Sequence, residues 1–147
     1  MIGRILSRLS QAPRPEAPAD ERLALAALLV RLARADGVYD PAEIARIDKV
    51  LAARFALPTG EAAALRRRAE ALESEATDTV RFTRKIKDMV PLEQRIAIIE
   101  TLWEIALADS ALDDEEAGLM RLVASLLGIN DRDSALARQR VRARERG

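Results

Sequence analysis

Cysteine and histidine are both absent from this chain of 147 residues. Without cysteine there is no disulfide, no thiolate zinc site and no cysteine nucleophile. Without histidine the chain lacks the usual general base and the commonest ligand of transition metals. Any site must therefore use carboxylates, hydroxyls, lysine, arginine or backbone groups. A metal held by such groups should be a hard ion that prefers oxygen, namely Ca²⁺, Mg²⁺ or Mn²⁺.

Aromatic residues are scarce, and long apolar runs and an excess of one charge are missing. Aromatics make up 3% of the chain, and the abundance of alanine, leucine, arginine and glutamate favours helices over strands. No apolar run reaches the roughly 20 residues that span a bilayer, and the start of the chain lacks the apolar core of a secretory signal, so we expect a cytoplasmic protein. Basic and acidic residues balance at 24 each, which indicates no nucleic-acid partner.

One pattern occurs twice, and a constant offset in the numbering relates its two copies. The pattern consists of an apolar helix, an acidic turn and an amphipathic helix, and its second copy fills residues 95–127. The matched pairs are acidic or apolar at the same places: Asp36 with Asp109, Asp40 with Asp113, Glu43 with Glu116, Leu29 with Leu102, Leu32 with Ile105, Ala33 with Ala106, Ile47 with Met120, and Val50 with Val123. A fixed offset that preserves both kinds of position indicates two copies of one helix–turn–helix unit.

The periodicity predicts an all-α protein, a single compact bundle of about seven helices built on these two units. Three parts are expected along the chain. Residues 1–19 form an amphipathic segment and a proline-rich linker, residues 20–130 form the helical domain, and residues 131–147 form a basic C-terminal helix or tail. Arginines at alternate positions in 138–146 scatter charge around a helix, which predicts a solvated or frayed end, with an anionic partner as the alternative.

The N-terminal segment leaves two interpretations open. Apolar residues recur at helical spacing: Ile2, Ile5, Leu6 and Leu9. They could contact a membrane surface or a partner through residues 1–10, or they could dock on the core of the domain itself or fray. An isolated helix shorter than about 12 residues is marginal in water, which favours docking or fraying over a separate amphipathic helix.

The acidic turns also have two interpretations. Asp40 and Asp113 suit helix caps, and Glu43 and Glu116 suit the third position of a helix. However, Asp36 and Asp109 fall at helix ends, where a carboxylate is disfavoured by roughly 0.3–1 kcal/mol. Either a divalent cation is bound by Asp36, Glu43, Asp109 and Glu116, with Asp40 and Asp113 as caps or secondary ligands, or each aspartate accepts hydrogen bonds from its own turn. The spacing does not match an EF-hand, so a cation site would need both copies, docked with their turns together.

The helix ending Ala35-Asp36-Gly37, followed by Asp40-Pro41-Ala42-Glu43, resembles the TerB family of tellurite-resistance proteins. Residues 108–116 resemble the same family's later acidic turn, although Ser110 replaces the glycine of the first copy. The resemblance covers about residues 20–130. It implies a compact helical domain found in bacteria, an association with tellurite and general stress responses, and metal ligands at Asp36, Glu43, Asp109 and Glu116.

We therefore expect a TerB-like domain that is not an enzyme and that binds a divalent cation, a protein partner or both through a paired acidic face. One alternative is a pure protein-interaction module in which the acidic turns only cap helices. Another is a metal-dependent hydrolase that uses the same carboxylates. No nucleophile motif or glycine-rich phosphate loop accompanies them, which favours the non-catalytic interpretation.

Overall fold

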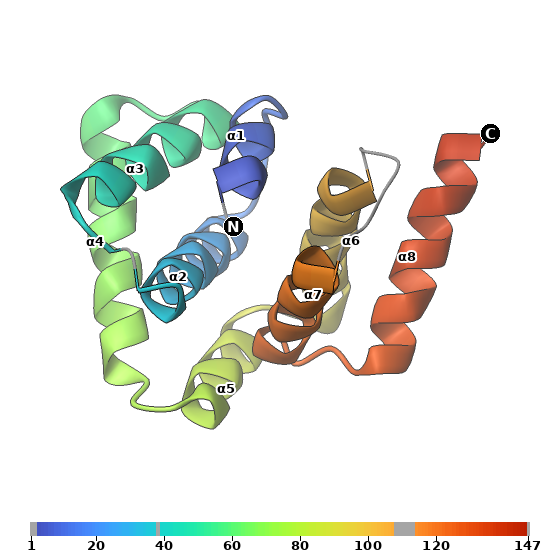
Figure 1. Ribbon diagram of the computed structural model, residues 1–147. Helices are drawn as coiled ribbons and strands as arrows, with labels where there is room; N and C mark the ends of the chain where they lie inside the picture. The colour runs from blue at the N-terminus through green and yellow to red at the C-terminus, as the bar shows by residue number, and fades with distance from the viewer. Residues whose placement is uncertain (1–2, 38, 108–113, 147) are drawn as a thin grey trace. The chain divides into compact units, whose positions relative to one another are not determined.

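The computed structural model describes residues 3–37, 39–107 and 114–146 (Figure 1). All regular structure in these ranges is helical, which confirms the all-α prediction. The eight helices within them are α1 (Gly3–Ser10), α2 (Ala19–Ala35), α3 (Pro41–Phe55), α4 (Thr59–Glu75), α5 (Thr79–Met89), α6 (Leu92–Leu107), α7 (Asp114–Leu126) and α8 (Asp131–Arg146). None of these described helices is long and apolar enough to cross a membrane.

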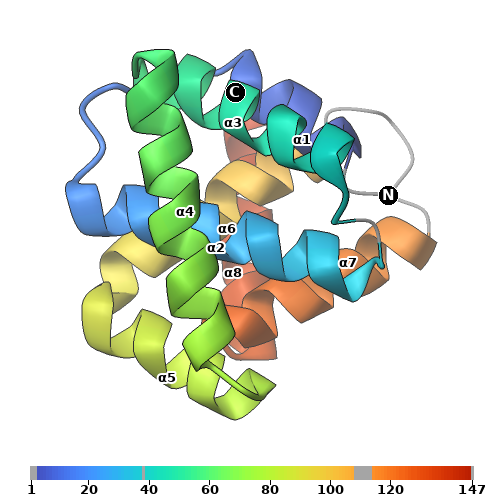
Figure 2. The ribbon, with the colours of Figure 1, turned by 90° about the vertical axis from the view of Figure 1, so that its left-hand side faces the viewer.

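The helices group into two compact units, α1–α4 and α5–α8, which meet in sequence at Asp78 and Thr79. In each unit the second helix packs against the fourth and the first packs against the third. The third helix of each unit also contacts the second and the fourth. Figure 2 shows the first of these contacts, with α4 crossing α2. The two units therefore share one packing scheme, and α1 to α4 correspond in order to α5 to α8.

The helix starts define how the two units align. α2 begins at Ala19 and α6 at Leu92, and the same offset of 73 in the numbering relates the starts of α3 and α7. α4 begins at Thr59 and α8 at Asp131, which is an offset of 72. The offset falls because the second unit has one residue fewer between the starts of its third and fourth helices. The repeated unit is thus a set of four helices, whereas the sequence predicted a repeated pair.

The centre of the first unit is α2. Every residue from 24 to 30 is at most 4% exposed. A helix that is apolar around most of its circumference must be covered on several sides, and α3 and α4 supply much of that cover. α6 occupies the corresponding place in the second unit, where Ile99 and Leu102 are buried.

The N-terminal segment docks on its own unit. α1 packs against α3, and Ile5, Leu6 and Leu9 are at most 5% exposed. Arginines hold the linker that follows: Arg54 Nη1 donates to the Ala12 carbonyl at 2.7 Å. Arg14 Nη1 lies 3.0 Å from Glu21 Oε2. The segment is therefore docked on the domain in this structure. A membrane contact through residues 1–10 stays a prediction, and it would require α1 to leave α3.

The C-terminal helix is packed as well. α8 lies against α6, with Ala137 and Val141 fully buried. Arg140 Nε lies 3.3 Å from Glu100 Oε2, and Arg144 Nη2 lies 3.1 Å from Glu100 Oε1. Arg140, Arg142 and Arg144 are exposed, as expected for a solvated end. The helix is not frayed, because buried apolar residues and ion pairs to α6 hold it in place.

Candidate functional site

The turn between α2 and α3 holds the first group of predicted site residues. α2 ends at Ala35, and the N–H of Asp36 still donates to the Leu32 carbonyl at 3.0 Å. Gly37 follows with φ of 76°, the left-handed conformation that ends many helices. Asp40 then caps α3, since its Oδ1 accepts the Glu43 N–H at 2.9 Å. The predicted cap at Asp40 is confirmed, and the turn places Asp36 at one helix end and Glu43 at the start of the next.

Glu43 has an environment that a capping role does not explain. Asp36 and Asp40 are exposed, whereas Glu43 is only 7% exposed. Its Oε2 lies 3.5 Å from Arg46 Nη1, and its Oε1 is buried without a hydrogen-bond donor in the described part of the chain. Burying a carboxylate oxygen without a donor is unfavourable. Glu43 is therefore a candidate for a ligand that supplies the missing partner.

The other predicted ligands are not brought together with Glu43 by the described structure. Among residues 3–37, 39–107 and 114–146, no three acidic side chains are grouped so that they could hold one metal ion. Asp109 and Asp113 lie outside the described residues, as does the side chain of Glu116. The four-ligand site, the meeting of the two turns and the cap at Asp113 stay predictions.

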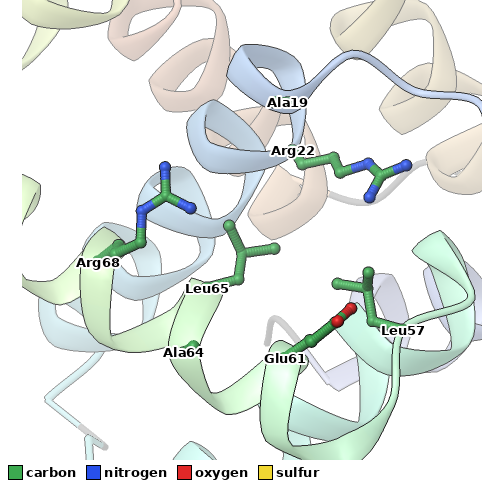
Figure 3. Close-up of a pocket in the computed structure, with 7 residues that line it drawn as sticks. All are labelled: Ala19, Arg22, Leu57, Glu61, Ala64, Leu65 and Arg68. Carbon is green, nitrogen blue, oxygen red and sulfur yellow. The ribbon is translucent and has the colours of Figure 1, made fainter.

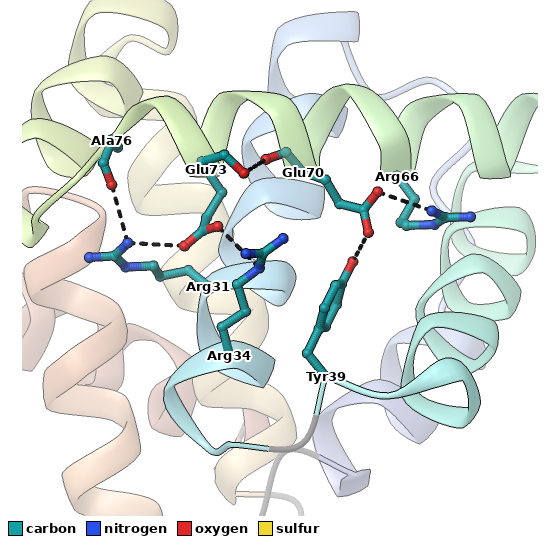
Figure 4. Close-up of polar contacts among 8 residues, drawn as sticks. Arg31, Arg34, Tyr39, Arg66, Glu70, Glu73 and Ala76 are labelled. Carbon is teal, nitrogen blue, oxygen red and sulfur yellow. Dashed lines mark hydrogen bonds and ion pairs between the residues drawn. The ribbon is translucent and has the colours of Figure 1, made fainter.

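Tyr39 fixes this turn to α4 (Figure 4). Its hydroxyl donates a short hydrogen bond to Glu70 Oε2, and the guanidinium of Arg34 lies over its ring, 4.9 Å from the centroid. Glu70 in turn accepts from Arg66 Nη1 at 3.0 Å. The position of the acidic turn is therefore set by a polar network as well as by the helix ends.

Arg66 connects that network to a second carboxylate. It reaches back to α3, where its Nε and Nη2 lie 2.9 Å and 3.2 Å from the two carboxylate oxygens of Asp48. These hydrogen bonds to Asp48 raise the pKa of Arg66, and Glu70 acts in the same direction. A guanidinium held between two carboxylates thus joins α3 to α4.

Ionisation of Tyr39 is expected to destabilise the protein at alkaline pH. Burial raises the pKa of its hydroxyl above the ordinary value of 10.0, and the hydrogen bond to Glu70 adds to this. A raised pKa in the folded state stabilises the fold below pH 10, and this stabilisation is lost as the pH rises toward the folded-state pKa. Tyr39 is the only tyrosine, so the ultraviolet absorbance of tyrosinate reports on it alone.

We expect this absorbance to appear together with the loss of helical circular dichroism. The Tyr39→Phe variant should lose stability less steeply above pH 10. A tyrosinate signal with its midpoint near pH 10 in a protein that is still helical would contradict the raised pKa.

A cavity of about 260 Å³ opens in the same unit, beside the starts of α2 and α4 (Figure 3). Its lining consists of Ala19, Arg22, Leu57, Glu61, Ala64, Leu65 and Arg68. Figure 3 shows the two arginines on either side of Leu65, with Glu61 extending toward Leu57. Arg22 already donates to the carbonyls of Ala17 and Pro15, and Glu61 and Arg68 are exposed, so the lining of this cavity indicates no particular ligand.

A repeated pair of arginines was not predicted. Arg22 and Arg95 are matched by the same offset as the acidic turns, near the starts of α2 and α6. In each case Nε donates to a carbonyl that precedes it in the chain, at 2.8 Å for Ala17 and 3.0 Å for Val90. The sequence could have revealed this pair, because the two arginines are separated by the same offset as the matched acidic residues.

Comparison with known proteins identifies a family for most of the chain. A family model described as tellurite resistance protein TerB matches residues 22–139, from the first turn of α2 into α8. Searches of curated proteins and of solved structures gave no match. The family match includes both repeated helix pairs and their acidic turns. Since it covers most of the 147 residues, the chain belongs to the TerB family of tellurite-resistance proteins.

Proposed function

We propose that this TerB domain is non-catalytic and binds a divalent cation at the acidic turn between α2 and α3, with Glu43 as the central ligand. The observation that carries the proposal is the buried Glu43 Oε1, which lacks a donor within the described ranges. A cation would supply the missing positive partner. Asp36 stands at the end of α2, where the last carbonyls carry partial negative charge and favour a cation too.

The donor chemistry selects the kind of ion. Carboxylates, backbone carbonyls and water are ligands of Ca²⁺, Mg²⁺ and Mn²⁺. Asp109 and Glu116 hold the matching positions of the second repeat, and we propose them as further ligands, with Asp40 and Asp113 as caps or secondary ligands. The absence of histidine and cysteine supports a binding role over catalysis, and the cytoplasm remains the expected compartment.

Calorimetry with each of the three ions tests the proposal. The unmutated protein should bind at least one of them, and Glu43→Gln and Asp36→Asn should each weaken binding by about tenfold or more, as expected for a lost charged ligand. Asp20→Asn is the matched control, because Asp20 is exposed at the opposite end of α2. Thermal stabilisation should reach about 2.7 kcal/mol at a hundredfold excess of the ion over Kd.

Two further results bear on the proposal. Without added ion, Glu43→Gln should be no less stable than the unmutated protein, because it removes a buried charge that is only partly paired. If none of the ions binds to the unmutated protein, the cation proposal fails.

The same carboxylate suits a second candidate function. A lysine or arginine from a protein partner could donate a hydrogen bond to the buried Glu43 Oε1 in place of a metal. In that case, no ion would shift the melting temperature, and Glu43→Gln would weaken the complex with that partner. The cation titration therefore separates the two functions.

A further inference from the structure

A cavity of about 210 Å³ lies among α6, α7 and α8 in the second unit. Arg121 and Arg138 line it, together with Trp103 and Ser134. The guanidinium of Arg138 lies over the Trp103 ring, 5.2 Å from the centroid. The indole N–H of Trp103 donates to Ser134 Oγ at 3.2 Å. Two cationic groups thus meet an aromatic ring and a hydroxyl in one cavity.

Two arginines and one carboxylate, Asp131, line this cavity, which leaves it with a net positive charge. Arg138 Nε is buried and lacks a hydrogen-bond partner in the part of the chain that the structure describes. Neither Arg121 nor Arg138 has an ion pair with a carboxylate among those residues. Burial lowers the pKa of Arg138, and the nearby charge of Arg142 adds to this. A partly buried guanidinium with another cation beside it favours an anion as its partner.

The first unit shows what a neutralised version of this site looks like. α4 and α8 align at an offset of 72, so Arg138 corresponds to Arg66. Arg66 lies 2.9 Å from Asp48 on α3 and 3.0 Å from Glu70 on its own helix. Two carboxylates therefore hold the corresponding arginine in the first repeat.

Both carboxylates are replaced by arginine in the second repeat. α3 and α7 align at an offset of 73, which puts Arg121 at the position of Asp48. The offset of 72 between α4 and α8 puts Arg142 at the position of Glu70. The helices and the central arginine are kept, while the charges around that arginine are reversed at two independent positions.

We propose that this cavity binds a small, doubly charged oxyanion, which takes the place of the two missing carboxylates. Arg121 and Arg138 would donate to its oxygens. Ser134 Oγ accepts from Trp103, so its own hydrogen is free to point at the anion. Asp131 also lines the cavity and opposes an anion, but it is exposed and therefore well screened, as is Arg121. Arg138, with its buried Nε, is therefore the main donor. This site has the opposite charge preference to the acidic turn, and the two are tested separately.

Inorganic phosphate is the probe, titrated into the full-length protein at constant ionic strength and followed by calorimetry and fluorescence. Trp103 is the only tryptophan, so a change in its emission places the binding event in this cavity. Arg138→Gln should weaken phosphate binding by about tenfold or more. Acetate, with a single charge, should bind more weakly than phosphate.

Arg121→Asp tests the proposal most directly, because it introduces the carboxylate that the first repeat has at this position. It should pair with Arg138, abolish phosphate binding and raise the melting temperature measured without phosphate. Arg132→Gln is the matched control, since Arg132 is exposed on α8 and does not line the cavity. It should leave phosphate binding unchanged.

Three results would overturn the proposal. One is a phosphate titration without binding heat and without a thermal shift beyond that of chloride at the same ionic strength. Another is phosphate binding that Arg121→Asp and Arg138→Gln leave intact. The third is an equal loss of binding in Arg132→Gln, which would show general attraction to a basic surface.

Discussion

Arg95→Met is expected to lower the free energy of unfolding by about 3 kcal/mol or more, since each buried carbonyl left without its donor costs about 1–3 kcal/mol. Arg95 is 7% exposed. Its Nε donates to Val90 at 3.0 Å, and its Nη1 donates to the carbonyls of Leu127 and Gly128 at 2.8 Å and 3.3 Å. One side chain thereby joins the segment after α5, the start of α6 and the end of α7.

Electrostatics explain why a cation is tolerated at this buried position. Burial lowers the pKa of Arg95, but its partners include carbonyls at the end of α7, where the helix dipole is negative. Gly128 belongs to the same arrangement. It has φ of 67°, and a Cβ there would lie 2.9 Å from Lys87 Cγ and 3.3 Å from Arg95 Nη1. Methionine keeps the apolar stem of Arg95 but none of its hydrogen bonds.

Denaturant unfolding of Arg95→Met measures this effect, and Arg22→Met is its matched control. Arg22 occupies the same place in the first repeat, but it is less buried and lies over the Phe55 ring, 5.5 Å from the centroid. Its hydrogen bonds to the carbonyls of Ala17 and Pro15 are part-buried and exposed, so water can replace Arg22 there and its loss should cost about 1 kcal/mol. Equal losses of unfolding free energy in the two variants would contradict the role of Arg95 in joining the start of α6 to the end of α7.

Glu73→Ala is expected to lower the free energy of unfolding by about 2 kcal/mol, below the roughly 3–5 kcal/mol of a fully buried ion pair. Glu73 is 5% exposed on α4 and accepts from two arginines of α2: its oxygens lie 3.0 Å from Arg31 Nη1 and 3.2 Å from Arg34 Nε (Figure 4). The Arg34 side chain is 42% exposed, so water can solvate it once the carboxylate is gone. That solvation reduces the expected loss.

The second unit supplies the comparison for Glu73. Its α6 and α8 are joined with the charges reversed, since Arg144 on α8 lies 3.1 Å from Glu104 on α6. Both side chains are more than half exposed, and the second partner of Arg144, Glu100, keeps its ion pair with Arg140 when Arg144 is removed, so Arg144→Ala should cost less than about 1 kcal/mol. Chemical denaturation of both variants tests this order. A larger loss in Arg144→Ala than in Glu73→Ala would show that burial does not decide the strength of these links.

Local rules were enough for the helices and for one cap. The repeated pattern predicted an apolar helix at α2, and an aspartate before proline predicted the cap at Asp40, because both signals depend on neighbours in sequence. The four-helix repeat was not predicted. α4 and α8 share a burial pattern more than residue types, since Leu65 and Val141 are both buried while their matches are alanines. The change of offset from 73 to 72 also breaks the register.

Side-chain environments could not be read from the sequence, because they depend on helices that are distant along the chain. Glu43 looks like an ordinary third residue of a helix, and its burial follows only from tertiary packing. Arg138 looks like one arginine of a basic tail. The lack of a carboxylate beside it becomes evident only when Arg66 and its partners show what stands there in the other unit.

The docked N-terminal helix has a consequence for recombinant work on this protein. The family match begins at residue 22 and stops at residue 139, but Leu6 and Leu9 of α1 and Val141 of α8 are at most 1% exposed. A fragment trimmed to the matched boundaries would uncover hydrophobic surface on α3 and α6 and should be prone to aggregate. Expression should therefore start before α1 and continue to the end of α8.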